Sequence, residues 1–155
     1  MPFQIHALDP APFAPLFKMD DAALSRRNAR RVRVDACPGA PCRVSLRDAP
    51  VGETVILVNH VHLDAPGPYR ASHAIYVRAS VPRSRPAPDT VPDALRRRDL
   101  SLRAIGPNGS INDAALTPGA GASAEIERLL ARDDVAEVHV HFAARGCYAA
   151  RATRV

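Results

Sequence analysis

The stretch VAEVHVHF, residues 135–142, alternates apolar and polar side chains, which is typical of a half-buried β-strand. Successive side chains of a strand point to opposite faces, so its apolar residues, Phe142 included, share the face that we expect to lie against the core. The opposite face carries Glu137, His139 and His141. The same stretch therefore predicts both a core strand and a row of ionisable groups.

On either side of this strand, other segments show strand patterns. Residues 54–60, TVILVNH, are continuously apolar and β-branched, which indicates a central strand covered on both faces. The residues GPNGS, 106–110, mark a hairpin between two further strands. The expected strands are 3–8, 30–35, 42–46, 54–60, 74–79, 100–106, 110–116, 135–142 and 147–155.

Short helices are expected at 19–28, 93–99 and 123–132, the first with Asp20 as its N-cap and the last with Ser123. Strands and helices do not alternate regularly, which argues against a parallel βαβ sheet. A chain of 155 residues fits one hydrophobic core. We therefore expect an α+β fold, a single domain over residues 1–155 with a central, mixed or mostly antiparallel sheet and two or three short helices.

The charge of the chain is positive, with a formal net value of +5 at pH 7. Lys18 is the only lysine among 21 basic residues, and such arginine, alanine and proline usage is typical of a GC-rich genome. The charge by itself therefore does not indicate a polyanion partner. The run Arg96–Arg98 lacks interleaved aromatic residues and a helix-turn-helix pattern, so nucleic acid is a disfavoured partner.

The N-terminus lacks the basic and apolar regions of a secretory signal, and no segment approaches the ~20 apolar residues that a membrane span needs. The cysteines, Cys37, Cys42 and Cys147, are odd in number, which argues against a set of structural disulfides. These features predict a cytoplasmic protein without membrane contact. The sequence does not indicate an oligomeric state.

Four longer stretches together resemble a known family. They are PGAPCRVSLRDAPVGETVILVNHVHL (38–63), PYRASHAIYVR (68–78), LSLRAIGPNGSINDAAL (100–116) and VAEVHVHFAARGCYAARA (135–152). The resemblance is to the bacterial family called domain of unknown function 1203. It implies a small, single-domain bacterial protein, and it implies no activity or site residues. The chain departs from the expected pattern at Phe142, where we expect a polar residue, and at Ser72 and His73, where we expect a turn of small residues.

Two histidine pairs suggest a metal site. An H-x-H pair on a strand presents two imidazoles on one face, where they can bind one metal ion. His139 and His141 form such a pair, and His60 and His62 form another at the end of the central strand. We predict His139, His141 and His62 as ligands of a divalent metal ion, with Glu137 close by. The alternative is that these residues only hydrogen-bond to their neighbours on a polar strand face.

The histidines also suggest catalysis, because a cysteine thiolate beside a histidine or arginine is a good nucleophile. Cys147 follows His141 closely in the chain, and Cys42 directly precedes Arg43. The predicted catalytic residues are therefore His139, His141, Cys147 and Cys42, with a histidine as the general base. The alternative is that both cysteines are small, inert core residues.

Arginines in or beside predicted strands form a third group. A guanidinium binds a carboxylate or phosphate through two parallel hydrogen bonds. The predicted ligand-binding residues, for a small anionic ligand, are Arg43, Arg70, Tyr76 and Arg78, and Arg103 has a similar position. The alternative is that these arginines form ion pairs with the sixteen acidic residues.

Together these groups predict a small-molecule-binding or catalytic pocket around His139, His141 and Cys147. The sequence indicates neither the substrate nor the reaction. The alternative function is a non-catalytic module that binds an acidic partner or nucleic acid through its arginines, with the histidines in structural roles. Added salt would separate the two functions, because polyanion binding weakens steeply with salt.

Overall fold

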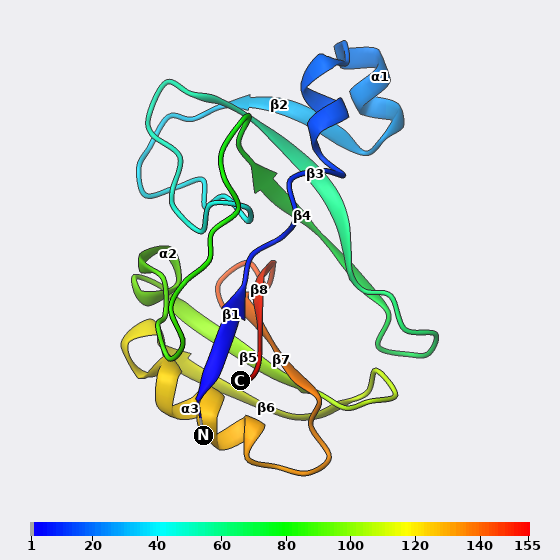
Figure 1. The fold of residues 1–155 in the computed structure, drawn as a ribbon. Helices are drawn as coiled ribbons and strands as arrows, with labels where there is room; N and C mark the ends of the chain where they lie inside the picture. Colours follow the sequence, from blue (N-terminus) through cyan, green and yellow to red (C-terminus); the bar gives the residue numbers. More distant parts are fainter. Residues whose placement is uncertain (1) are drawn as a thin grey trace.

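The structure, a computed structural model, describes residues 2–155, whose strands form two antiparallel β-sheets (Figure 1). The α+β class, the antiparallel pairing and the short helices predicted from the sequence are confirmed. The strands are divided between a five-stranded and a three-stranded sheet rather than gathered in one. None of the helices in this range is long and apolar enough to span a bilayer.

The five-stranded sheet has the order β1-β8-β7-β5-β6. Its strands are β1 (Phe3–His6), β8 (Tyr148–Arg154), β7 (Glu137–Phe142), β5 (Asp99–Ile105) and β6 (Ile111–Pro118). The short η2 (Gly119–Gly121) leads into α3 (Ala122–Leu130), whose apolar stripe packs on one face of this sheet. The apolar residues of β7 lie in this core, Phe142 among them, as the alternation predicted. The histidine face of β7 points away from α3.

The three-stranded sheet has the order β2-β3-β4, with β2 (Ala29–Arg33), β3 (Thr54–Leu63) and β4 (Ala71–Val77). Strand β3 is central, as its apolar run predicted, and it buries Val55, Ile56 and Val58. The helical segments η1 (Ala14–Lys18) and α1 (Asp21–Arg26) lie beside this sheet, in the upper half of Figure 1. The α1 N-cap is Asp20, which accepts a hydrogen bond from the Ala23 amide, as expected.

Two local predictions are wrong. Residues 42–46 form no strand, because Leu46 adopts a positive φ of 54° and its amide bonds back to the Cys42 carbonyl, which turns the chain. Only an isolated bridge joins Cys42 to Tyr76. Helix α3 begins at Ala122 with Gly121 as its N-cap, so Ser123 lies inside the first turn and does not cap it. The remaining short helix, α2 (Asp93–Arg96), ends earlier than expected.

The β3–β4 and β5–β6 hairpins extend to the same side of the molecule (Figure 1). Their tips meet, because a Cβ placed on Gly109 would overlap the Cβ of Ala65. Gly109 also has a positive φ of 80°, which side-chain-bearing residues adopt only with strain. The two sheets are therefore joined at this end by a contact between loops.

We expect Gly109→Ala to destabilise the protein by about 2–5 kcal/mol, from about 1–2 kcal/mol of backbone strain and about 1–3 kcal/mol of overpacking. The matched control is Gly52→Ala, since Gly52 has a φ of 90° but open space around its Cβ position. This control should show the strain alone. Thermal unfolding of both variants measures the difference, and equal losses would contradict the loop contact.

Candidate metal centre

Histidines from both sheets meet in the space between them. Strand β7 contributes His139 and His141, and the β3–β4 hairpin contributes His60, His62 and His73. His60 pairs with His73 across the hairpin, and the register shifts between Val61 and Leu63. Such a shift is a β-bulge, which changes the direction of a side chain, and His62 lies within this one. The ring of Tyr148, at the start of β8, stacks on His62 with centroids 5.3 Å apart.

Three of these histidines form a compact trio, which we call the His trio: His62, His73 and His141. Each offers one ring nitrogen, and these nitrogens all lie within 4.8 Å of one another. The closest approach is 2.9 Å, between Nε2 of His62 and Nδ1 of His73. The side chain of His141 has no exposure to solvent. The trio thus brings together residues from three strands and both sheets.

Hydrogen bonding fixes the tautomer of His141. Its Nδ1 lies 2.9 Å from the Gly146 carbonyl oxygen, which can only accept, so Nδ1 carries the proton and donates. The Nε2 atom therefore holds a lone pair. Within residues 2–155 this buried Nε2 has no hydrogen-bond partner, and the same is true of Nδ1 of His62. An imidazole whose second nitrogen donates to a carbonyl is typical of a metal ligand.

Burial keeps the trio uncharged. Desolvation is the main cause that lowers the pKa of His62 and of His141 to about 3. The hydrogen bond to the Gly146 carbonyl acts in the opposite direction on His141, and the charge of Arg103 lowers the pKa of both residues further. Burial also lowers the pKa of His73 below its ordinary value. All three imidazoles are therefore neutral at pH 7, which is the form that binds metal.

His139 lies next to the trio rather than within it. Its Nε2 donates to Glu137 Oε1 at 2.8 Å, and the other oxygen of Glu137 accepts from Arg151 at 2.9 Å. These two hydrogen bonds hold the pKa of Glu137 below its usual range, and the one from His139 has the larger effect. Nδ1 of His139 is buried and without a partner in the described chain. The predicted ligands His141 and His62 thus lie in the trio, where His73 takes the place expected for His139.

One spacing within the trio fits a metal ion. Two nitrogens bound at 2.0–2.1 Å lie about 3.3 Å apart at a tetrahedral angle and about 2.9 Å apart at a right angle. Nε2 of His62 and Nδ1 of His73, hydrogen-bonded at 2.9 Å, have a separation that two ligands of one ion also have. Separations of up to 4.8 Å within the trio are longer than this, so metal binding requires these side chains to move closer together.

A groove of about 920 Å³ is lined by one member of the trio, His73. Along β4 it is lined by Tyr76, Ala74 and His73, and its opposite wall includes Phe142 and Cys147. His73 is thus shared between the groove and the trio. A small molecule in the groove would reach the histidines through this residue.

The cysteines predicted as nucleophiles do not contact a histidine. Cys147 lines the groove, and its Sγ accepts a hydrogen bond from Nη2 of Arg43 at 3.2 Å. Cys42 is buried in the core of the smaller sheet, where its Sγ lies 3.4 Å from the Ser45 amide. No hydrogen bond joins either thiol to a histidine within residues 2–155. The nucleophilic role of both residues stays a prediction.

The predicted ligand-binding arginines do not converge. Arg43 is buried beneath the groove, Arg78 makes two hydrogen bonds to Glu53, and the exposed Arg70 pairs with Asp64. Tyr76 does line the groove together with Arg43. Phe142, where the family pattern led us to expect a polar residue, is packed between the guanidinium groups of Arg43 and Arg98, each 5.0 Å from the ring centre.

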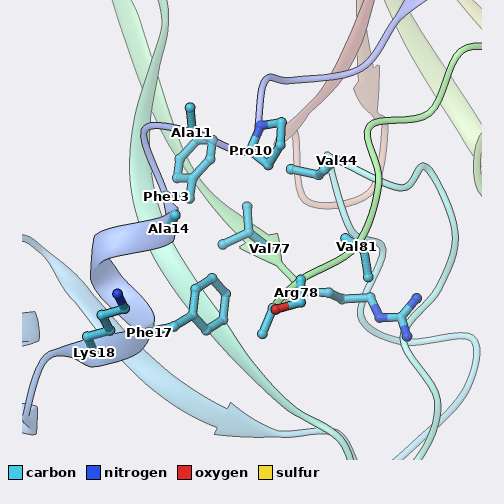
Figure 2. A pocket seen from close by; sticks show the side chains of 12 residues that line it. Pro10, Ala11, Phe13, Ala14, Phe17, Lys18, Val44, Val77, Arg78 and Val81 are labelled. Atoms are coloured by element: carbon cyan, nitrogen blue, oxygen red, sulfur yellow. The ribbon is translucent and has the colours of Figure 1, made fainter.

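A second cavity, of about 430 Å³, lies between η1 and the smaller sheet. Figure 2 shows the rings of Phe13 and Phe17 beside Val77, with Lys18 and Arg78 at opposite ends. Arg78 is already bound to Glu53, and the other charged group of the lining is Lys18. Among the described residues, this lining contains no histidine, cysteine or carboxylate.

Sequence reasoning missed His73 as a ligand, although a signal was present. A hairpin that turns at Pro66 and Gly67 places residue 60 opposite residue 73, as the structure shows. The chain between these residues contains the turn-forming sequence DAPGPY. Counting outward from that turn would have paired His73 with the H-x-H at the end of β3.

Comparison with known proteins gives one match. A family model described as "Protein of unknown function (DUF1203)" matches residues 39–154, most of the chain. The match includes every member of the His trio. No curated protein and no solved structure matches.

Proposed function

The chain belongs to the DUF1203 family, and we propose that it is a metal-dependent protein whose divalent ion is bound by His62, His73 and His141. His73 lines the groove, so a small molecule that enters the groove would meet the proposed site at this residue. The proposal makes the groove the substrate-binding site and the trio the reactive centre. The proposed protein is thus an enzyme in which a metal ion acts as a Lewis acid toward a small-molecule substrate.

The observation that carries this proposal is the lone pair on Nε2 of His141. The atom is buried, has no partner within residues 2–155, and lies beside two other imidazoles. Leaving a buried polar atom unsatisfied costs about 1–3 kcal/mol. A metal ion at this position would satisfy Nε2 of His141, and it would replace the hydrogen bond that joins Nε2 of His62 to Nδ1 of His73.

The ligand set favours zinc. Imidazole nitrogens suit zinc, copper, nickel and iron, and the trio itself contains neither a thiolate nor a carboxylate. Three protein ligands leave a tetrahedral zinc ion with one open position, which is typical of catalytic rather than structural sites. A zinc ion held by these three imidazoles would supply Lewis acidity and would lower the pKa of a water bound to it. Metal-assisted hydrolysis or hydration is the chemistry that this arrangement supports.

Metal analysis of the untagged protein tests the proposal. We expect about one equivalent of zinc after purification or reconstitution, and loss of that zinc in His141→Ala. The matched control is His6→Ala, because His6 is half-buried on β1 and hydrogen-bonds to Thr153 outside the trio. This control should keep its zinc. Absence of zinc, iron, nickel and copper from the reconstituted parent would contradict the proposal.

A further inference from the structure

A divalent ion bound by the His trio would carry a positive charge that its ligands do not neutralise. Its three imidazoles are neutral and supply no negative charge to offset the ion. Glu137, the carboxylate next to the trio, already accepts hydrogen bonds from His139 and Arg151. The open position of the metal therefore lies in a field that attracts an anion.

Arg103 adds to this positive field. It lies on β5 directly opposite His139 of β7, with Ser101 opposite His141 in the same register. Cross-strand partners share one face of a sheet, so the Arg103 side chain projects from the face that carries the histidines. Its charge also contributes to lowering the pKa values of the trio.

Arg103 has no acidic partner among residues 2–155, in contrast to two other partly buried arginines. Arg98 is bound to Asp48 and Arg78 to Glu53. Asp113, on the neighbouring strand β6, pairs instead with arginines of the α3 side of the sheet. Asp99 shares the face of Arg103 but lies four residues along the strand, about 13 Å away. Burial lowers the pKa of Arg103, yet leaves it fully protonated at neutral pH.

We propose that the centre takes a small oxyanion, the carboxylate or phosphate group of a small molecule. One oxygen binds the open position of the metal ion, and a second accepts hydrogen bonds from the guanidinium of Arg103. This inference rests on the proposed function, because it requires the metal. It names the substrate class of the same site and identifies Arg103 as its specificity-determining residue.

The groove that His73 lines supports an anionic ligand. Its lining includes Arg43, Arg98 and Arg145, and Asp99 as its one carboxylate among the described residues. Arg145 is exposed and has no acidic partner within residues 2–155. The apolar part of the lining, which includes Leu57 and Phe142, suits the body of a small organic molecule.

Cobalt(II)-loaded protein provides the test. The visible absorption of bound cobalt changes when an added anion enters its coordination sphere. We expect inorganic phosphate and acetate, titrated separately, to give saturable spectral changes, and the tighter of the two distinguishes a phosphorylated from a carboxylated ligand. Loss of the charge-assisted hydrogen bonds in Arg103→Gln should weaken this binding by about 10- to 100-fold at unchanged cobalt content.

Two further variants separate the role of Arg103 from general positive charge. Arg103→Lys keeps the charge without the planar fork and should weaken binding less than Arg103→Gln. Arg26→Gln removes an exposed charge in the last turn of α1, outside the groove, and should change binding by less than about threefold. Equal affinity in Arg103→Gln and the parent, or no spectral change with either anion, would overturn the proposal. Failure to take up cobalt would instead refute the proposed function, and metal analysis before titration reveals that case.

Discussion

Replacing Arg43 with alanine is expected to lower the free energy of unfolding by about 3–5 kcal/mol. The side chain is 2% exposed and links the two halves of the molecule. Its Nε donates to the Tyr148 carbonyl at 2.8 Å, and another nitrogen donates to the Pro41 carbonyl. Both buried acceptors lose their donor in the variant, and a cavity forms beside Phe142.

The size of this effect depends on two opposing contributions. A buried guanidinium without a carboxylate partner is costly to desolvate, which the lowered pKa of Arg43 reflects. We expect the hydrogen bonds and packing to outweigh that cost, since the planar fork satisfies two carbonyls and the Cys147 thiol together. Arg43→Lys keeps the charge but cannot reach all three acceptors, so it should show an intermediate loss.

Urea unfolding measures the difference, with Arg70→Ala as the control. Arg70 is exposed and pairs with Asp64 at the surface, so its removal should cost less than about 1 kcal/mol. If Arg43→Ala unfolds at the same urea concentration as the control, the desolvation cost of the buried guanidinium is as large as the free energy that its hydrogen bonds and packing contribute. Arg43 would then not be what holds the two sheets together.

Zinc is expected to raise the thermal unfolding midpoint of the metal-free protein by roughly 8–16 °C. An ion that binds only the folded state at about a thousand times its Kd stabilises that state by about 4 kcal/mol. For a chain of this size each kcal/mol shifts the midpoint by about 2–4 °C. The half-buried His73 lies at the rim of the trio, so His73→Ala should fold yet show little response to zinc.

His60→Ala is the control for this experiment. His60 belongs to the same histidine cluster, with ring contacts to Phe13 and Tyr148, but it is not a member of the trio. The control should respond to zinc as the parent does. An equal response in His60→Ala and His73→Ala would show that zinc binds the histidines non-specifically, which contradicts the assignment of the trio.

The faces of individual strands could be predicted because alternation is a local property. The pattern of 135–142 correctly placed Phe142 in the core and His139 and His141 on one face. The hairpin at GPNGS was equally local, since glycine and asparagine there suit the turn. The strand expected at 42–46 was wrong because alternation did not reveal the turn at Leu46, whose amide bonds back to the Cys42 carbonyl.

The candidate site could be predicted only in part. The sequence pointed to His139, His141 and His62, which do lie close together, but it offered no means of ranking them. Periodicity does not reveal that Glu137 holds His139 beside the trio, or that a bulge brings His62 against His73. It also does not reveal that the thiol of Cys147 lies against Arg43 rather than a histidine.

The sequence by itself determined the α+β class, most strand positions and the row of histidines on β7, because these follow from residue-to-residue periodicity and turn chemistry. Only the tertiary structure decided that the polar face of the larger sheet is buried against the β3–β4 hairpin. Packing between two sheets depends on contacts far apart in the chain, which no local pattern records. That packing turns a polar strand face into an enclosed cluster of neutral imidazoles with Arg103 beside it.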